Sequence, residues 1–261
     1  TKPNFISMIM PARWFTGGKG LDKFREKMLH DKRISFIKDF QASTDCFPSV
    51  SIEGGICYFL WNEFNKGECL VINSRNNDLS KMKRPLKEDN SEIFIRYNEA
   101  VSIFRKTRKN TEESFSSIVS TRKPFGFDST FRDFKNSHSS GTIKIYANKS
   151  SGFVDKKKIK HNLVWTNKPK VYISEAYGMG SFPSQIINKP FYDEEESCCT
   201  ETYLVIGPFN SSIEQHAAFF YMKTKFFRFC VLFKKNSQHG TRDVYQFVPL
   251  QDFTANSDID W

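Results

Sequence analysis

The stretch FISMIMPARWFTGGKGLDKFREKMLHDKRISFIKDF, residues 5–40, decides the fold class of its part of the chain. Residues 5–11 form an apolar run that predicts a short buried strand. Residues 21–30 carry apolar side chains at helical spacing, which predicts an amphipathic helix. Residues 34–40 read as the next strand. A strand, a helix and a strand in succession are typical of an α/β domain.

Two further strands are expected downstream of this stretch. They are SVSIEGGICYFLW, residues 49–61, and ECLVINS, residues 68–74, and the intervening NEFNKG favours a hairpin turn. Antiparallel strands of this kind close many α/β sheets. Gly54 and Gly55 interrupt the first of the two strands, which indicates that the backbone bends there or passes close to another segment.

A change of composition predicts a domain boundary after these strands. Residues 76–92 are polar and charged and nearly free of large apolar side chains, so we interpret them as a linker or an exposed hairpin. Residues 93–261 follow as an α+β region. Helical spacing predicts a helix within residues 93–109, and Ser211 with Glu214 forms a capping-box pattern before a long helix over residues 212–235.

The charge of the chain favours a polyanionic partner. Lys and Arg number 39 against 29 Asp and Glu, which gives a formal net charge of +10, and nucleic acid is the simplest partner for such a balance. A Lys-rich surface without a specific partner is the alternative. The six cysteines form no CxxC motif and no zinc-spaced cluster, so we expect a cytoplasmic protein. No apolar stretch is long enough to span a membrane.

Several patterns with possible chemistry are weak. TGGKG, residues 16–20, matches neither the P-loop nor the dinucleotide loop, so a plain turn is favoured over a phosphate site. The acidic run of residues 193–196 favours a solvated loop over a metal site, and we expect no metal. The five histidines are scattered and form no credible nucleophilic set.

Two segments interleave basic and aromatic residues. STRKPFGF, residues 120–127, and KTKFFRF, residues 223–229, combine side chains that contact phosphates with rings that stack on bases. In KTKFFRF a buried helix whose cations extend to solvent explains the pattern equally well.

The order of the segments is more specific than any one of them. SMIMPARWFTGGKGLDKFREKMLHDKRISFIKDF, CFPSVSIEGGICYFLW, FIRYNEA, VSTRKPFGF, CTETYLVIG, TKFFRF and YQFVPLQDF follow one another over residues 5–253. In this order they resemble the C-terminal half of N6-adenine DNA methyltransferases of bacterial type II restriction-modification systems. The early segments resemble the late catalytic motifs of that family, and the others resemble its target-recognition region.

The resemblance implies a mixed α+β fold in two parts. Residues 1–75 would supply the last strands and one helix of a Rossmann-like methyltransferase sheet. After the segment of residues 76–92, residues 93–261 would form a target-recognition domain that binds double-stranded DNA. The catalytic N-terminal half of a longer parent chain would be the other partner.

The resemblance also implies an activity and its limits. Such enzymes transfer a methyl group from S-adenosylmethionine to N6 of an adenine that is flipped out of the duplex. The family's Phe-x-Gly-x-Gly cofactor loop and its Asn-Pro-Pro-Tyr motif are both absent from this sequence. In the family the Asn-Pro-Pro-Tyr motif orients N6 of the adenine, and the glycine loop binds the methyl donor. We therefore expect no catalytic residue and no cofactor site in this chain, and no activity of the chain alone.

Particular residues acquire roles from the same resemblance. Phe47, in a Phe-Pro step, matches a residue that packs on the face of the flipped adenine; a core position is the alternative. The expected DNA contacts are Ser120, Thr121, Arg122, Lys123, Lys225 and Arg228, with Arg96 and Tyr97 as weaker candidates. Arginine can read guanine with two hydrogen bonds, whereas lysine more often meets phosphate.

Two other readings stay open from the sequence. The same basic and aromatic segments suit a protein that binds RNA or single-stranded nucleic acid. A self-contained enzyme with an unrecognised active site is the other alternative.

Overall fold

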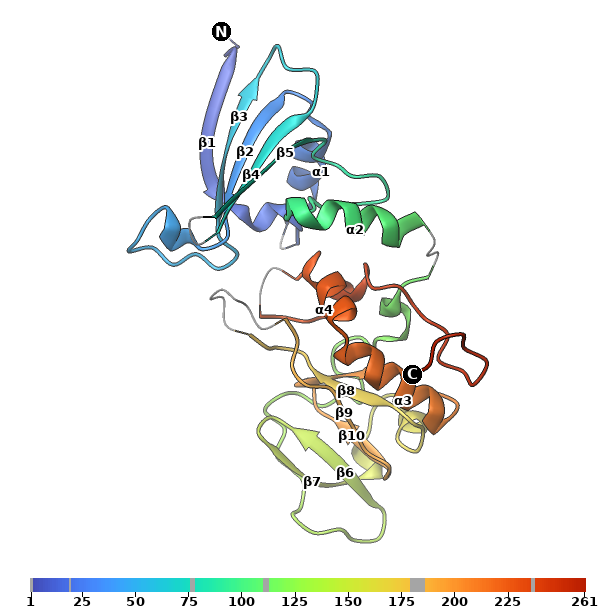
Figure 1. The fold of residues 1–261 in the computed structure, drawn as a ribbon. Helices are drawn as coiled ribbons and strands as arrows, with labels where there is room; N and C mark the ends of the chain where they lie inside the picture. The colour runs from blue at the N-terminus through green and yellow to red at the C-terminus, as the bar shows by residue number, and fades with distance from the viewer. Residues whose placement is uncertain (1, 19, 76–77, 110–112, 179–185, 236–237) are drawn as a thin grey trace. The chain divides into compact units, whose positions relative to one another are not determined.

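The chain folds into two compact units, each described by itself. The computed structural model describes residues 2–18, 20–75, 78–109, 113–178, 186–235 and 238–261. The first unit comprises the described residues up to 109, and the second comprises those from 113 onward. The mixed α+β class predicted from the sequence is confirmed, with sheets and helices in both units (Figure 1).

A five-stranded sheet forms the first unit, in the order β1-β3-β2-β4-β5. Its elements are β1 (Phe5–Pro11), α1 (Asp22–His30), β2 (Ile34–Phe40), β3 (Ile56–Asn62), β4 (Cys69–Arg75), β5 (Asp78–Arg84) and α2 (Asn98–Lys109). β3 pairs antiparallel with both β1 and β2, whereas β2 and β4 are parallel. The strand, helix and strand expected over residues 5–40 are therefore present.

The predicted hairpin between residues 49–61 and 68–74 is wrong, and the first of these two strands begins only at Ile56. β3 and β4 are consecutive in the sequence, but β2 lies between them in the sheet. β4 instead pairs parallel with β2, from Phe36 opposite Leu70 to Phe40 opposite Ser74. β2 thus takes the central place, where both of its edges are hydrogen-bonded and its Ile37 is fully buried.

The first strand is not buried, although its apolar sequence predicted burial. β1 lies at one edge of the sheet, and none of its residues is buried. Phe5, Met8 and Ile9 are 57%, 49% and 49% exposed. An edge strand has only one neighbour, so its side chains contact fewer partners than those of β2.

The boundary expected at residues 76–92 lies elsewhere in the structure. Residues 78–84 form β5, which pairs antiparallel with β4 along its whole length. The hairpin reading of this segment fits that pairing, but the linker reading does not. Residues 93–95 are buried and α2 packs on β4 and β5, so the first unit continues to the end of α2. Polar residues on an edge strand produced the change of composition.

The core of the first unit lies between the sheet, α1 and the segment before α2. Trp14 and Phe15 pack with Phe94, with ring centroids 6.3 and 4.6 Å from it. Ile37 and Val71 come from the two central parallel strands. A 3-10 turn at Ala12–Phe15 carries Trp14 and Phe15 into this core directly after β1.

The described residues of the second unit form two three-stranded sheets and two α-helices. The sheet orders are β10-β6-β7 and β11-β8-β9. The strands are β6 (Thr142–Ala147), β7 (Ser150–Asp155), β8 (Val171–Ser174), β9 (Phe191–Tyr192), β10 (Ser197–Cys199) and β11 (Tyr203–Ile206). Short 3-10 turns lie at Phe115–Ile118, Lys156–Lys158, Leu163–Trp165 and Arg242–Tyr245. The core of the sheets gathers Phe125, Ile145, Tyr172 and Val205.

The single long helix predicted over residues 212–235 is two helices. α3 (Ser212–Lys223) and α4 (Lys225–Leu232) are separated by Thr224, whose backbone is extended. The Thr224 hydroxyl donates to the Tyr221 carbonyl at 2.8 Å and accepts from the Phe227 amide at 3.1 Å. One threonine thus ends one helix and caps the next. The serine half of the predicted capping box is present, because Ser211 Oγ accepts from the Glu214 amide at 3.2 Å. The Glu214 carboxylate accepts from the Asn210 amide at 3.3 Å rather than from that of Ser211.

Among the described residues, no helix has the length and apolarity that crossing a membrane requires.

Candidate nucleic-acid interface

The loop between β2 and β3 carries Phe47 on a defined turn. The Phe47 amide donates to the Ser43 carbonyl at 2.8 Å, and the Val50 amide donates to the Phe47 carbonyl at 2.9 Å. The Phe47 side chain is 41% exposed. The ring therefore does not plug the core, and a large part of it is open to a ligand. Figure 1 shows the loop extending beyond the end of the sheet at which β2 ends.

Ser43 ties the two sides of this loop together. Its side chain is 3% exposed. The hydroxyl donates to the Val50 carbonyl at 2.6 Å and accepts from the Ile52 amide at 2.8 Å. A buried hydroxyl with both roles filled holds the intervening residues, Phe47 among them, in one arrangement.

The glycines at the end of the loop allow a close approach of backbone segments. Gly55 has φ of +78°, and a Cβ there would lie 2.2 Å from the Phe40 carbonyl oxygen. Its own carbonyl accepts from the Ala12 amide at 3.0 Å. The bend and close approach expected from the Gly-Gly pair are thus confirmed.

Arg96 anchors the base of the loop to the sheet. Its guanidinium donates two hydrogen bonds to Asp39, each of 2.7 Å, and a third of 2.8 Å to the Gly54 carbonyl. Asp39 is fully buried. Burial alone would lower the pKa of Arg96, but the charge of Asp39 and these hydrogen bonds raise it. Arg96 therefore stays cationic and holds the loop, which is a structural role rather than DNA contact.

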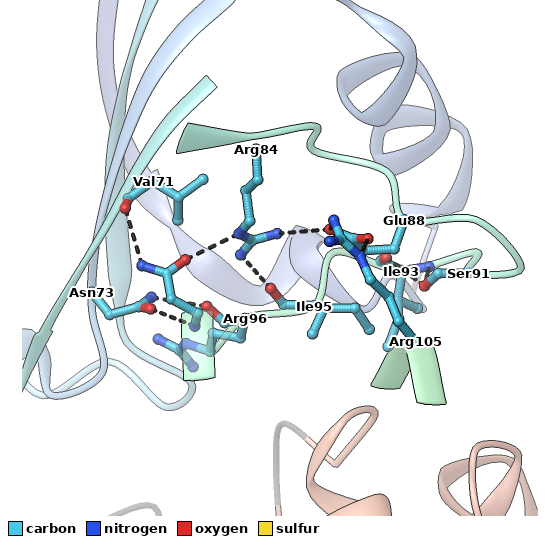
Figure 2. A network of polar contacts seen from close by, with 10 residues as sticks. Val71, Asn73, Arg84, Glu88, Ser91, Ile93, Ile95, Arg96 and Arg105 are labelled. Carbon is cyan, nitrogen blue, oxygen red and sulfur yellow. Dashed lines mark hydrogen bonds and ion pairs between the residues drawn. The ribbon is translucent and has the colours of Figure 1, made fainter. Parts of the chain in front are cut away.

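A polar network continues from Arg96 through the first unit (Figure 2). Asn73 donates to the Arg96 carbonyl at 2.8 Å and accepts from the Asn98 amide at 2.9 Å. Arg84 donates to Asn98 Oδ1 at 3.0 Å and to the Ile95 carbonyl at 2.6 Å. Burial lowers the pKa of Arg84 to about 10, against the opposing effect of Glu88. The start of α2 is thereby fixed to β4 and β5.

Tyr97, the other weak candidate, is half-buried beside Arg96. Burial raises the pKa of its hydroxyl. The charge of Arg96 opposes this effect.

The Gly-rich turn before α1 uses its own side chains as partners. The Gly18 amide donates to Asp22 Oδ1 at 3.0 Å, and Arg25 donates to the same oxygen at 2.9 Å. A carboxylate already occupies the place that a phosphate would need, which supports the reading as a plain turn.

The acidic run of residues 193–196 makes ion pairs with the neighbouring strands. Asp193 accepts from the Tyr146 hydroxyl at 2.6 Å and pairs with Lys144 at 3.0 Å. Glu196 pairs with Lys156. These contacts tie the acidic loop to β6 and to the segment after β7.

In the second unit, the STRKPFG segment divides into a buried and an exposed part. Ser120 is 6% exposed, and its hydroxyl accepts from the Val205 amide at 2.9 Å. Its place beside β11 corrects the prediction that Ser120 contacts DNA, because the side chain is committed to the core. Thr121, Arg122 and Lys123 are exposed.

Both basic residues of this segment already have acidic neighbours. Arg122 pairs with Glu201 at 3.2 Å, although 64% of its side chain is exposed. Lys123 pairs with Asp128, which raises the pKa of the ammonium. These ion pairs hold the two cations in place before a ligand binds. A phosphate would have to compete with the carboxylates for them.

The other predicted pair lies on α4. Lys225 is exposed at the first turn of the helix and Arg228 is half-buried. Phe226 is 41% exposed, whereas Phe227 is fully buried. Some residues of KTKFFRF therefore lie at the surface and others in the core. The exposed residues fit the reading as a nucleic-acid contact, and the buried ones fit the reading as a buried helix.

Sequence reasoning missed a segment that lies against STRKPFG. The Lys160 amide donates to the Phe125 carbonyl at 3.2 Å, and Asn162 Nδ2 donates to the Pro124 carbonyl at 2.8 Å. The run KKKIKH, residues 156–161, was the available signal. These contacts place a second basic segment beside Arg122 and Lys123.

The comparisons with known proteins agree with the sequence resemblance. Residues 1–47 match the family model of the Eco57I restriction-modification methylase. A relative described as an uncharacterized adenine-specific methylase, from Mycoplasma pneumoniae (strain ATCC 29342 / M129 / Subtype 1), is 34% identical over 110 residues. That match covers 40% of this chain and 25% of the relative. The resemblance to adenine methylases of restriction-modification systems is confirmed by these two matches.

Two solved structures are also similar to the chain. The type IIG restriction endonuclease BpuSI has a TM-score of 0.34 at 12% identity, over 94% of this chain and 40% of its own. The type IIL restriction-modification enzyme MmeI, solved in complex with DNA, has a TM-score of 0.48 at 10% identity, over 93% of this chain and 37% of its own. The chain spans only about a quarter of the length of the curated methylase.

Proposed function

We propose that this chain is the DNA target-recognition region of a site-specific adenine-N6 methyltransferase, together with the end of its catalytic sheet. The exposed, anchored Phe47 is the observation that carries the proposal. An aromatic ring held outside the core by Ser43 and Arg96 is suited to stacking on a base, and each stacked base contributes about 1–3 kcal/mol.

The topology of the first unit supports a Rossmann-like origin. β1 and β2 are both antiparallel to β3, so they run in the same direction, and α1 connects them. This is a crossover connection with an antiparallel strand inserted between its two parallel strands. The Phe47 loop follows the carboxyl end of β2, which is the end at which open α/β sheets bind their ligands.

The sequence of the edge strand β1 supports the proposal that another part of the enzyme packs on this edge and completes the sheet. β1 carries no charged residue, whereas β5 at the opposite edge carries the exposed charges of Asp78, Lys81 and Lys83. Exposed edge strands are normally protected by charges. We assign the uncovered β1 edge to the catalytic part of the methyltransferase, which would supply the S-adenosylmethionine loop and the Asn-Pro-Pro-Tyr motif.

The second unit would meet double-stranded DNA through Thr121, Arg122, Lys123, Lys225 and Arg228. Methyl transfer by this chain alone is not expected, since it has neither of the two motifs. Incubation with labelled S-adenosylmethionine and mixed-sequence DNA tests this directly; clear turnover would make the chain a self-contained enzyme.

A competition experiment tests the choice of ligand. The chain should shift a labelled DNA duplex in a gel, and unlabelled duplex should compete better than RNA or single-stranded DNA of equal length. Better competition by RNA or by a single strand would favour the alternative, a binding protein for those nucleic acids.

A further inference from the structure

We propose that Leu163 and Val164 form an apolar wedge that enters a base step of duplex DNA. The inference rests on the proposed function, because it takes duplex DNA as the ligand, and it adds a contact that reads the deformability of DNA. Val164 is 69% exposed and Leu163 is 49% exposed. They are adjacent in the short 3-10 turn Leu163–Trp165.

The turn that carries the two side chains is firmly held. Asn162 precedes it in the left-handed conformation, with φ of +51°, and its side-chain amide donates to the Pro124 carbonyl. The Thr166 hydroxyl donates to the Leu163 carbonyl at 2.8 Å. Trp165 lies edge-on to Phe125, with ring centroids 6.5 Å apart. The tip is therefore ordered before any ligand binds, which lowers the entropy lost on insertion.

A buried lysine fastens the chain just after the turn. Lys170 is 1% exposed, and its ammonium donates to the Thr166 carbonyl at 2.9 Å and to the Lys168 carbonyl at 3.2 Å. The Thr166 carbonyl also accepts from the Ser197 amide at 3.0 Å. Thr166 thus joins the turn to β10 and to the buried ammonium, and the apolar tip projects from a fixed base.

The surroundings of the tip decide the kind of partner. Exposed basic residues surround Leu163 and Val164. Those nearby in the sequence are Lys157, Lys158, Lys160 and Lys168, and those in the contacting STRKPFG segment are Arg122 and Lys123. Two apolar side chains are too few for a stable protein interface. A polyanion whose interior is apolar fits both features, and duplex DNA is such a partner, because a base step that unstacks exposes apolar ring faces between two phosphate backbones.

The physical consequence is a local change in the DNA. Apolar side chains inserted between base pairs partially unstack them and kink the duplex, at a cost that the surrounding phosphate contacts offset. Steps that unstack easily would then be bound more tightly than stiff ones, without any hydrogen bond to a base edge.

Fluorescence of 2-aminopurine reports unstacking of the bases, which the wedge should cause and which DNA binding without a wedge should not. A short duplex carries 2-aminopurine at every adenine position of one strand, so unstacking in any register raises the emission. We expect saturating chain to raise it at least twofold, and Leu163→Ser/Val164→Ser to remove most of the rise. The single variant Val164→Ser should remove part of it. Ile213→Ser, at an apolar residue of α3 that is 58% exposed, is the matched control and should leave the rise intact.

Affinity, measured in parallel by anisotropy of a labelled duplex, distinguishes the possible failures. Binding of the duplex with no rise in emission would overturn the wedge and leave the proposed function standing. A rise that persists in the double variant would also overturn the wedge. Failure of the chain to bind any duplex would overturn both proposals.

Discussion

Phe47 shows how much a single residue depends on its setting. The residue alone favours a core ring, and the resemblance to adenine methyltransferases adds base stacking as an alternative of equal weight. The structure removes the core reading, since Ser43 and Arg96 hold the loop so that Phe47 is 41% exposed. The long-range contacts of Arg96 with Asp39 and Gly54 join residues far apart in the sequence, and no local pattern could have predicted them.

The stacking role of Phe47 gives a direct prediction for an unpaired adenine. A duplex with one bulged 2-aminopurine should lose emission when the chain binds, because a stacked ring quenches it. Phe47→Ala should abolish the quenching and weaken binding of the bulged duplex by about fivefold or more, from the loss of at least about 1 kcal/mol of stacking. Phe64→Ala, at another exposed ring of the first unit, is the control. Equal losses in both variants would contradict the assignment.

The Arg96–Asp39 pair gives a prediction for stability. Arg96→Gln leaves Asp39 buried without its charged partner, so the free energy of unfolding of the first unit should fall by about 3–5 kcal/mol. Arg33→Gln removes exposed ion pairs with Asp31 and Glu63 and should cost much less than Arg96→Gln. Urea unfolding of both variants gives the comparison. The double variant Asp39→Asn/Arg96→Gln should recover part of the loss; a further additive loss would rule out the pairing.

Local sequence patterns predicted most of the helices and strands of the first unit, but not the order in which the strands pair in the sheet. Period and apolarity located α1 and β2, since both depend on nearby residues. The insertion of β3 beside β2 and the parallel pairing of β4 depend on the whole sheet. Residues 78–84 were read as polar linker or hairpin because an edge strand can be polar and still belong to a sheet. Thr224 divides a continuous apolar pattern through two hydrogen bonds that periodicity does not reveal.

The uncharged edge at β1 predicts a selective loss of function. Met8→Lys/Ile9→Lys places charges where the isolated chain exposes both side chains to water, so its free energy of unfolding should change by less than about 1 kcal/mol. In an enzyme that includes the catalytic part, the same change should abolish methylation of DNA. Leu79→Lys on β5, 52% exposed at the opposite edge, should spare that activity. Full methylation by the double variant would show that β1 is not the docking edge.

Across the whole molecule, buried thiols set the response to alkaline pH. Burial raises the pKa of Cys57, Cys69, Cys198 and Cys230 to about 12, from an ordinary value of 9.0. The folded state then retains protons that the unfolded chain loses, so this stabilisation is complete below pH 9 and declines as the pH rises toward 12. Each thiol should cost about 1 kcal/mol per pH unit above 9.

Lys170 acts in the opposite direction over part of that range. Burial lowers the pKa of its ammonium to about 8, so its contribution to stability rises between pH 8 and the ordinary value of 10.5. Burial also raises the pKa of the Cys199 thiol. Five thiols outweigh one lysine, and the urea midpoint should fall from pH 8.5 to pH 10. Cys57→Ala should make that fall smaller, and a midpoint that stays constant or rises would contradict these burial effects.

The most direct test of DNA recognition is the dependence of duplex affinity on salt. The logarithm of the association constant, plotted against the logarithm of the salt concentration, falls by about 0.9 for each phosphate that a cation neutralises. If Arg122, Lys123, Lys225 and Arg228 all meet phosphates, the slope should be about −3.6 or steeper, and Arg122→Ala/Lys123→Ala should reduce it by about 2. Lys87→Ala in the first unit should leave the slope unchanged. A slope near zero, or one that the double variant does not alter, would contradict DNA recognition by these residues.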